Sequence, residues 1–190
     1  MFVLKRILGM LRSPQAEWQA VTQDAPHIGT LHCNYLLPLC GLAAVATLIG
    51  MLVFDTAWSA QYGYSALRGQ ALRIALATYF FQIASVYLLA TVLYFLARTE
   101  KRSPSFLVAL QVAVYGSIPV LLSGATLVIP FNVVFMILAM TYSFHLYYLG
   151  AQRLIGIRPA DAAMFIGVAM FCVAVLSTAL GAVASALGLL

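Results

Sequence analysis

Charged side chains are scarce in this 190-residue chain. Only 8% of the residues are Asp, Glu, Lys or Arg, 64% are hydrophobic, and the mean hydropathy is +1.00. No charged residue occurs from Ser103 to Gln152. As one straight helix this stretch would be ~75 Å long, more than twice a hydrocarbon core of roughly 30 Å. A water-soluble domain of this size needs more polar surface, so we expect the chain to cross a membrane several times.

Sequence patterns for catalysis and metal binding are also missing. There is no His-Glu-x-x-His, no phosphate-binding glycine loop, no Gly-x-Ser-x-Gly elbow and no pair of carboxylates within an apolar run. Three cysteines, Cys33, Cys40 and Cys172, are odd in number and lack Cys-x-x-Cys spacing. We therefore expect no enzymatic activity, no disulfide framework, no metal and no cofactor.

The apolar runs predict an all-α, polytopic bundle of five transmembrane helices preceded by an amphipathic interfacial helix. Residues 1–32 are expected to form a cytoplasmic segment and residues 33–190 the membrane domain. The expected spans are residues 33–54, 71–97, 105–129, 131–150 and 163–187. The third and fourth spans should form a tight hairpin, because only Gly124 and Pro130 interrupt the long uncharged stretch.

The amino-terminal segment shows a two-sided helical pattern over residues 2–12. One arc carries Val3, Leu4, Ile7, Leu8, Met10 and Leu11, and the other carries Lys5, Arg6, Gly9 and Arg12. This pattern predicts a helix lying flat on an anionic leaflet. Ser13-Pro14 then predicts the start of a second short helix, in which Trp18 is expected at the level of the lipid headgroups.

The ten Lys and Arg residues are distributed in small groups between the apolar runs, so they indicate topology and not a nucleic-acid surface. Eight of them fall on one side of the predicted bundle: Lys5, Arg6, Arg12, Arg98, Lys101, Arg102, Arg153 and Arg158. Only Arg68 and Arg73 fall on the other side. The positive-inside rule therefore predicts a cytoplasmic amino terminus and an external carboxy terminus.

Two spans carry distinctive helix features. Pro119 cannot bond to the carbonyl of Tyr115, so we expect a kink there, with a serine hydroxyl as one replacement partner. Gly116, Val120 and Gly124 should form a smooth stripe for close helix packing. In the last span, small residues favour packing within the bundle over packing against a second copy: Ala174, Ser177, Thr178, Gly181, Ala182, Ser185 and Ala186.

Three sequence motifs carry a family resemblance. They are Ser13-Pro14 with Trp18 and Val21, then Tyr115-Gly116-Ser117-Ile118-Pro119, and finally Tyr147-Tyr148-Leu149-Gly150. Their order and spacing resemble the Yip-one (Ypt-interacting protein) family of five-span membrane proteins. The resemblance implies Rab-type GTPase binding in eukaryotic members, through a long cytosolic amino-terminal segment. With only residues 1–32 ahead of the first span, this chain is more similar to the short bacterial branch, which implies an inner-membrane location.

Polar residues inside the predicted spans are candidates for function. Gln82 and Gln111 could face each other across the second and third spans as interhelical glue. His145, near the end of the fourth span, could relay protons or could be neutral and bonded to Ser143 or a tyrosine; the neutral state is the favoured interpretation. Tyr115, Gly116 and Pro119 complete the candidate set.

Two functions remain open from the sequence. One is a non-enzymatic scaffold or adaptor that recruits a protein or organises anionic lipid at the cytoplasmic face, with Lys5, Arg6, Arg12 and Trp18 at the membrane surface. The other is a small transporter or channel with a polar cavity at the Pro119 kink. Membrane lipids and a protein partner at the cytoplasmic face are the expected partners, nucleic acid is not, and a homo-oligomer is left open.

Overall fold

The computed structural model describes residues 2–23, 27–54, 70–129 and 132–186, and this part of the chain contains helices and no strand. The expected loop after the first span and the turn at Pro130 lie outside the described residues. The elements are α1 (Phe2–Arg12), α2 (Pro14–Gln23), α3 (Ile28–Leu31), η1 (His32–Leu36), α4 (Leu37–Val53), α6 (Ala71–Thr99), α7 (Phe106–Gly116), α8 (Ile118–Ser123), η3 (Gly124–Val128), α9 (Val133–Gly150), η4 (Ala151–Ile155) and α10 (Pro159–Ala186).

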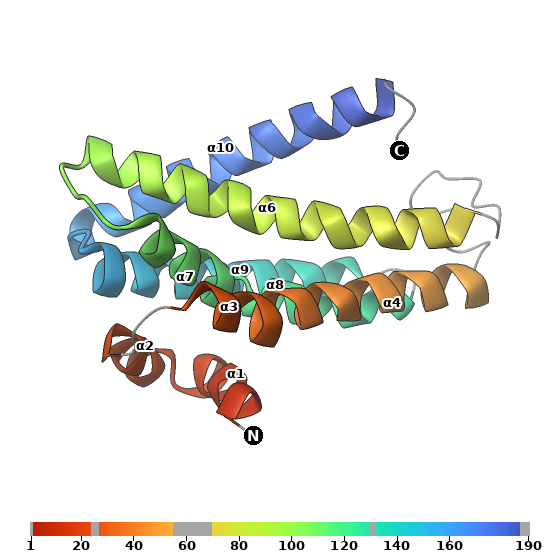
Figure 1. Ribbon diagram of the computed structural model, residues 1–190, viewed down its shortest axis with the longest axis horizontal. Coiled ribbons are helices and arrows are strands. Elements are labelled where there is room, and N and C mark those ends of the chain that lie inside the picture. The colour runs from red at the N-terminus through yellow and green to blue at the C-terminus, as the bar shows by residue number, and fades with distance from the viewer. Residues whose placement is uncertain (1, 24–26, 55–69, 130–131, 187–190) are drawn as a thin grey trace.

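The described helices form an all-α membrane bundle, as the sequence predicts. Four continuous helices are long and apolar enough to cross a bilayer: Ile28–Val53, Ala71–Thr99, Val133–Ile155 and Pro159–Ala182. The pair Phe106–Gly116 and Ile118–Val128, bent by 41°, supplies the fifth span when it is taken as one broken helix. Figure 1 shows α4 and α6 running side by side along the long axis, with α1 and α2 against one flank, and α9 packs against α7, α8 and α2.

Two π-helical turns lengthen the spans beyond their expected bounds. The first span begins at Ile28 instead of residue 33, because α3, the π-helical η1 and α4 are continuous. The fourth span runs past Gly150 through the π-helical η4 to Ile155. It ends at Gly156, whose φ of 80° is the left-handed conformation that glycine adopts most readily. The connection between the fourth and fifth spans is therefore reduced to residues 156–158.

The expected kink in the third span is present. α7 ends at Gly116 and α8 begins at Ile118, so the break lies just before Pro119. Ser117 Oγ donates to the Ala113 carbonyl at 2.6 Å, and the Ser117 N–H donates to the same carbonyl at 3.1 Å. The Ser117 and Ser123 hydroxyls bond to the carbonyls of Ala113 and Val120, so neither serine replaces the bond that Pro119 cannot give to the Tyr115 carbonyl.

The smooth stripe on the third span allows two close helix contacts. A Cβ added at Gly116 would lie 2.1 Å from Cδ1 of Tyr147 on α9. One added at Gly124 would lie 2.4 Å from the Ala43 Cβ on α4. Since neither position has room for a side chain, the glycines determine how closely α9 and α4 approach the broken span.

The expectation that the small residues of α10 pack within the bundle is wrong. The buried residues of α10 lie in its first three turns: Ala162, Phe165, Ile166 and Ala169. Beyond them Thr178 and Ala182 are exposed, and no atom lies within 4 Å of a Cβ built at Gly181. Figure 1 shows the reason, since α10 diverges from α6 towards its carboxy end and leaves the other helices behind.

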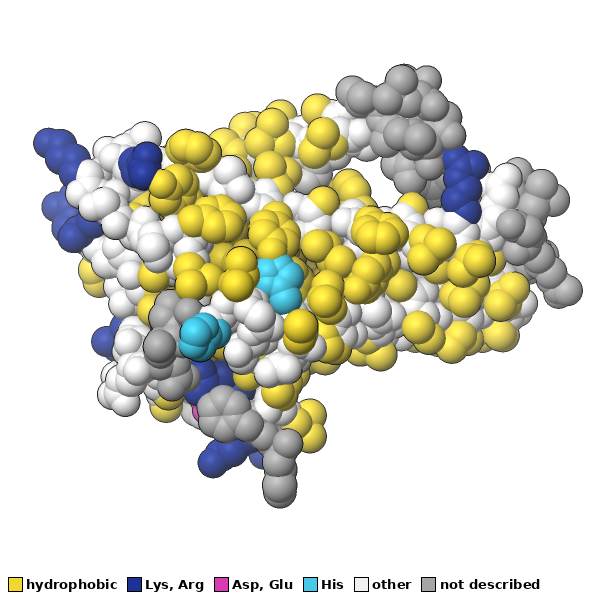
Figure 2. Space-filling view, viewed as in Figure 1, with side chains coloured by type: hydrophobic (Ala, Val, Ile, Leu, Met, Phe, Trp, Pro, Cys, Tyr) yellow, Lys and Arg dark blue, Asp and Glu magenta, His cyan; other side chains and the backbone are white. Residues whose placement is uncertain are grey.

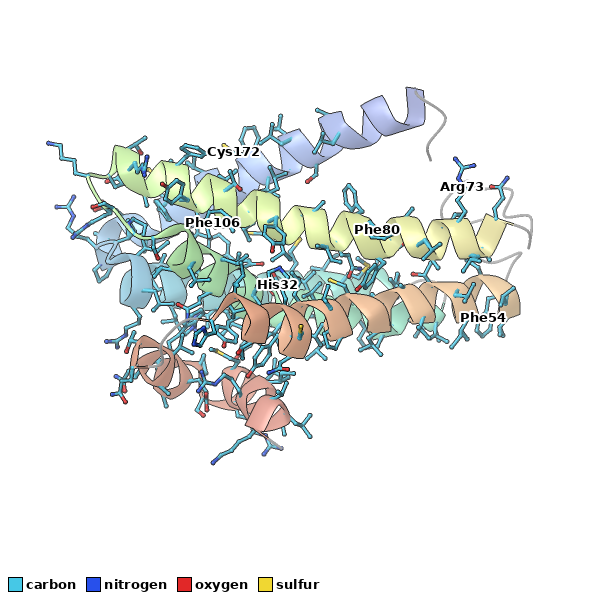
Figure 3. All side chains as sticks on the ribbon, viewed as in Figure 1. His32, Phe54, Arg73, Phe80, Phe106 and Cys172 are labelled. Atoms are coloured by element: carbon cyan, nitrogen blue, oxygen red, sulfur yellow. The ribbon has the colours of Figure 1, made fainter. Side chains whose placement is uncertain are left out.

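Charge is segregated along the bundle axis. In Figure 2 the Lys and Arg side chains gather at one end and beneath it, and a broad hydrophobic surface covers the middle. Arg73 lies at the opposite end, as labelled in Figure 3. This distribution separates a basic end, which holds α2 and the 100–105 and 156–158 connections, from an end with little charge among the described residues.

Candidate functional site: the docked amino-terminal helices

The amino-terminal helices are packed against the bundle, so they are part of the folded core. Met10 and Trp18 are fully buried, and Val21 is 1% exposed. The Tyr142 hydroxyl of α9 donates to the Leu11 carbonyl at 2.9 Å, which satisfies a backbone acceptor at the carboxy end of α1. α1 and α2 are therefore held in one defined position on the bundle.

Trp18, which was expected at the level of the lipid headgroups, is covered by protein on all sides. Its side chain is 0% exposed and its ring meets the Tyr115 ring edge-on, with centroids 6.2 Å apart. A Cβ built at Gly150 would be 2.8 Å from Trp18 Cη2, so the indole lies directly against the backbone of α9. Trp18 anchors α2 because the absence of a side chain at Gly150 leaves room for its large ring.

Arg6 is likewise buried and not on the membrane surface. Its Nε lies 3.7 Å from Glu17 Oε2, and the two side chains are 8% and 22% exposed. The contact joins α1 to α2, and Gly9 makes room for it: a Cβ at Gly9 would be 2.3 Å from Glu17 Oε1. The acidic partner explains why Arg6 turns inward, since a buried cation needs a compensating charge.

Two tyrosines continue this contact into the membrane domain. Tyr35, in η1, is 1% exposed, and its ring lies edge-on to Tyr115 with centroids 5.2 Å apart. The two tyrosines share a side-chain hydrogen bond, and Arg6 and Glu17 lie close enough to Tyr35 to interact with it electrostatically. We call Arg6, Glu17, Trp18, Tyr35 and Tyr115 the docking cluster, because they connect α1, α2, η1 and α7.

The Pro119 kink lies deeper in the bundle and is filled by side chains. Tyr147 and Ser117 share a hydrogen bond of 2.7 Å; because the single hydroxyl hydrogen of Ser117 goes to Ala113, Tyr147 is the donor. The Val120 N–H donates to Ser143 Oγ at 3.3 Å across to α9. Pro119 and Ser117 are buried, so the described kink is a packed helix contact.

The expected Gln82–Gln111 hydrogen bond is not formed. Gln111 is 4% exposed within α7, and Gln82 Oε1 is buried on α6 without a hydrogen-bond partner. Contact between α6 and α7 is extensive. Gln82 lies 17 residues before the end of α6 at Thr99, whereas Gln111 lies only 5 residues after the start of α7 at Phe106, so the two amides are at different depths of this helix pair. An unsatisfied buried amide oxygen is costly, which makes Gln82 a weak point of the α6 packing.

His145 lies on the surface beside α2. Its side chain is exposed and lines an open groove of about 480 Å³ with residues of the α1–α2 connection and α2: Ser13, Pro14, Gln15, Ala16 and Gln19. The Tyr142 ring is nearby, with centroids 6.1 Å apart. Ser143 bonds to Val120 instead of to His145. His145 therefore faces the groove beside α2 and not the interior of the bundle.

His32 is a polar contact that sequence reasoning missed. Its Nδ1–H donates to the Ile28 carbonyl at 2.8 Å, and its Nε2 is hydrogen-bonded to the Tyr87 hydroxyl of α6. In the neutral ring this arrangement makes Nε2 the acceptor. Figure 3 shows His32 at the start of the first span. The sequence places His32 ahead of the first span, whereas in the structure it lies in the π-helical turn η1 and contacts Tyr87 of α6.

Part of α1 remains free on the surface. Leu4 is 64% exposed and Leu8 41% exposed, and Lys5 and Arg12 are also exposed. The spacing of these four residues places them on one continuous side of the helix. We call Leu4, Lys5, Leu8 and Arg12 the outer face of α1. Elsewhere, the described residues contain no group of three or more His, Cys, Asp or Glu that could hold a metal ion.

Comparison with known proteins gives one match. The family model of the Yip1 domain matches residues 8–185, which include the docking cluster apart from Arg6, the kink and most of α10. No curated protein and no solved structure matches the chain.

Proposed function

The chain belongs to the Yip1 domain family, and from that premise we propose that it is a non-enzymatic membrane scaffold. Its docked amino-terminal helices gather anionic lipid at the cytoplasmic face and hold a platform there for a protein partner. The observation that carries this proposal is the buried Arg6–Glu17 contact, which fixes α1 so that one side faces outwards.

The outer face of α1 suits an anionic leaflet. Leu4 and Leu8 offer apolar surface to the acyl region, and Lys5 and Arg12 offer positive charge to lipid phosphates. Each Lys or Arg near such a surface contributes about 1 kcal/mol of attraction. Because the docking cluster holds the helix in place, little further ordering accompanies lipid binding.

The proposed orientation places the basic end of the bundle in the cytoplasm. α2 and the 100–105 and 156–158 connections lie at that end, and the positive-inside rule assigns it to the cytoplasmic side. For a bacterial member of the family, the membrane would be the inner membrane.

The packed kink favours the scaffold over the transporter alternative. A polar cavity at Pro119 would need open space lined by polar groups, whereas the Tyr147 ring occupies the space beside Gly116. The hydroxyl groups of Ser117 and Ser143 are also hydrogen-bonded to neighbouring protein atoms.

The test is native mass spectrometry of the full chain extracted in mild detergent. Lys5→Glu with Arg12→Glu reverses the outer face while leaving the buried Arg6 in place, and we expect it to lose retained anionic lipid. Pro119→Ala is the comparison variant and should retain that lipid. If the Lys5→Glu/Arg12→Glu variant keeps its lipid while Pro119→Ala loses a bound ion or small molecule, the scaffold proposal fails and the transporter hypothesis replaces it.

A further inference from the structure

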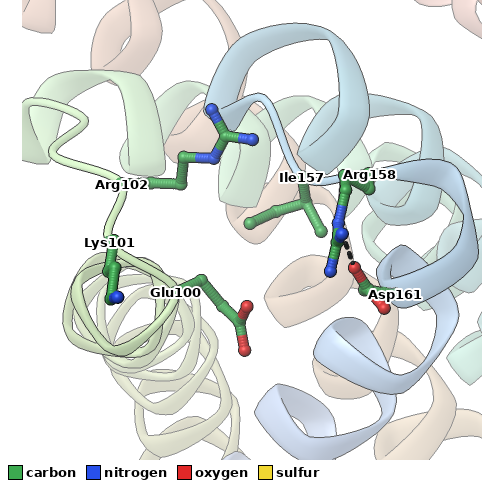
Figure 4. Close-up of a pocket in the computed structure, with 6 residues that line it drawn as sticks. All are labelled: Glu100, Lys101, Arg102, Ile157, Arg158 and Asp161. Carbon is green, nitrogen blue, oxygen red and sulfur yellow. Dashed lines mark hydrogen bonds and ion pairs between the residues drawn. The ribbon is translucent and has the colours of Figure 1, made fainter.

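A second candidate site lies at the basic end of the bundle, away from α1. It is an open pocket of about 330 Å³ between the residues that follow α6 and the start of α10. Its lining is Glu100, Lys101, Arg102, Ile157, Arg158 and Asp161 (Figure 4). We call it the end pocket. Because α6 ends and α10 begins there, it lies where two apolar spans end.

Charges of both signs in the end pocket are left unpaired. Arg158 Nε is bonded to Asp161 Oδ2 at 2.7 Å. Glu100, Lys101 and Arg102 have no ion-pair or side-chain hydrogen-bond partner within the described part of the chain. Figure 4 shows the Glu100 carboxylate directed into the space between the two connections, with the Arg102 guanidinium on the opposite side. The pocket therefore offers groups that could hold both an anion and a cation.

The backbone that presents these cations is unusual. Lys101 N–H donates to the Arg98 carbonyl at 3.1 Å and Arg102 N–H to the Ala97 carbonyl at 2.9 Å, the paired bonds of a Schellman motif. Lys101 occupies its left-handed position, with φ of 57°, where glycine is usual. Because the left-handed conformation disfavours residues with a side chain, the lysine at position 101 points to a function for its side chain.

An apolar stripe leads from the end pocket along α10. Met164, Val168, Phe171 and Val175 are 68%, 43%, 69% and 52% exposed. Their spacing of three and four residues continues the side of the helix that carries Asp161. A molecule with its polar group in the end pocket could thus lay a hydrocarbon chain along this stripe, which points to a phospholipid more than to a free phosphate compound.

We propose that the end pocket binds the headgroup of an amino phospholipid of the phosphatidylethanolamine type. The phosphate is held by Arg102 and Lys101, the primary ammonium by Glu100, and an acyl chain follows the stripe on α10. This inference deepens the proposed scaffold function, because it names a second lipid site. It depends on that proposal only for the identity of the leaflet.

The mixed charge explains the choice of headgroup. A phosphate without an amine would leave the Glu100 carboxylate beside it unpaired and repulsive. A choline headgroup carries charge but has no N–H to donate to the carboxylate. A glycerol headgroup can donate hydrogen bonds but has no positive charge, so only the primary amine combines a hydrogen-bond donor with a charge opposite to that of the carboxylate.

The test is lipid titration of the full chain in mild detergent, read by native mass spectrometry. The probes are dioleoyl phosphatidylethanolamine, phosphatidylcholine and phosphatidylglycerol, with soluble glycerophosphoethanolamine as a separate arm. We expect about tenfold tighter binding of the ethanolamine lipid than of the choline lipid, the value of one charge-assisted hydrogen bond. Glycerophosphoethanolamine, which lacks the acyl chains, should not compete at the same concentration.

Three variants assign the effect to the pocket. Glu100→Gln should abolish the preference for ethanolamine over choline. Lys101→Gly should weaken binding of all three lipids while leaving thermal stability unchanged or raised, because glycine fits the left-handed position better. Arg153→Ala removes an exposed cation at the same end that does not line the pocket, and it should bind like the wild type.

Several outcomes would overturn the proposal. They are equal binding of ethanolamine and choline lipids, a preference for the glycerol lipid, an unchanged preference in Glu100→Gln, or full competition by the soluble headgroup. None of these outcomes affects the proposed function, whose test reverses charge on α1. Conversely, loss of anionic lipid in the α1 variant with the ethanolamine preference intact would leave both proposals standing.

Discussion

Replacing Gly116 by alanine should destabilise the bundle, because the added methyl group has no room beside α9. The new Cβ would lie 2.1 Å from Cδ1 and 2.3 Å from Cε1 of Tyr147, so the ring or the helix must move. The ring has little freedom, because Tyr147 is 5% exposed and its hydroxyl donates to Ser117 at 2.7 Å.

The magnitude follows from two costs and one gain. Overpacking a well-filled core costs about 1–3 kcal/mol. Losing the Tyr147–Ser117 hydrogen bond costs about 1 kcal/mol more. Alanine offers up to about 1 kcal/mol in helix propensity, and less here because Gly116 is the last residue of α7. The net destabilisation expected is about 1–3 kcal/mol.

The assay is thermal unfolding of the detergent-solubilised chain, with Gly167→Ala as the matched control. Gly167 lies within α10, and no atom is within 4 Å of a Cβ built there, so its substitution should leave Tm unchanged or raise it. The double variant Gly116→Ala/Tyr147→Ala should be less destabilised than the sum of the two single variants, because removing the Tyr147 ring also removes its clash with the new methyl group. If Gly116→Ala and Gly167→Ala unfold at the same temperature, the close contact does not constrain the fold.

Three further predictions concern the docked helices and the π-helical turn. Arg6→Gln should leave the Glu17 carboxylate without its cation and increase hydrogen–deuterium exchange throughout α1. Adding Glu17→Gln should restore much of the protection, because an uncompensated buried charge destabilises more than the loss of the whole ion pair. Unchanged exchange in Arg6→Gln would mean that the ion pair does not hold α1. Tyr142→Phe removes a hydrogen bond worth about 1 kcal/mol to the carboxy end of α1, so exchange should rise there and not in α10. In Tyr87→Phe the Ile28 carbonyl still accepts from Nδ1–H, so ¹⁵N spectra should show the His32 proton staying on Nδ1 while the Nε2 resonance shifts because its hydroxyl partner is lost. An unchanged Nε2 resonance would show that the Tyr87 hydroxyl is not bonded to the ring.

Much of the architecture could be predicted from local patterns. The five apolar runs, the amphipathic period of residues 2–12 and the kink before Pro119 each depend on a few neighbouring residues, and each is present. Proline lacks an N–H wherever the chain folds, so its effect on a helix needs no knowledge of the partners.

The candidate site was harder to predict, because it depends on which elements meet. Periodicity showed that Arg6 shares one side of α1 with Lys5, but not that Glu17 of the next helix would cover Arg6 and leave Lys5 exposed. Trp18 has the amphipathic ring typical of a membrane interface, yet this ring packs against Gly150 in the core of the protein, where the glycine leaves room for it. The Gln82–Gln111 pair is not formed because the two residues lie at different distances from the connection between α6 and α7.

The sequence by itself determined that this protein is a helical membrane bundle with a broken third span and a basic end, because apolar length, proline and clustered charge act through local chemistry. Only the tertiary structure decided what the polar residues do. It paired Arg6 with Glu17, brought His32 to Tyr87 through a π-helical turn, and left Glu100, Lys101 and Arg102 unpaired around one pocket. These outcomes depend on the rotation and depth of packed helices, which many distant contacts determine together.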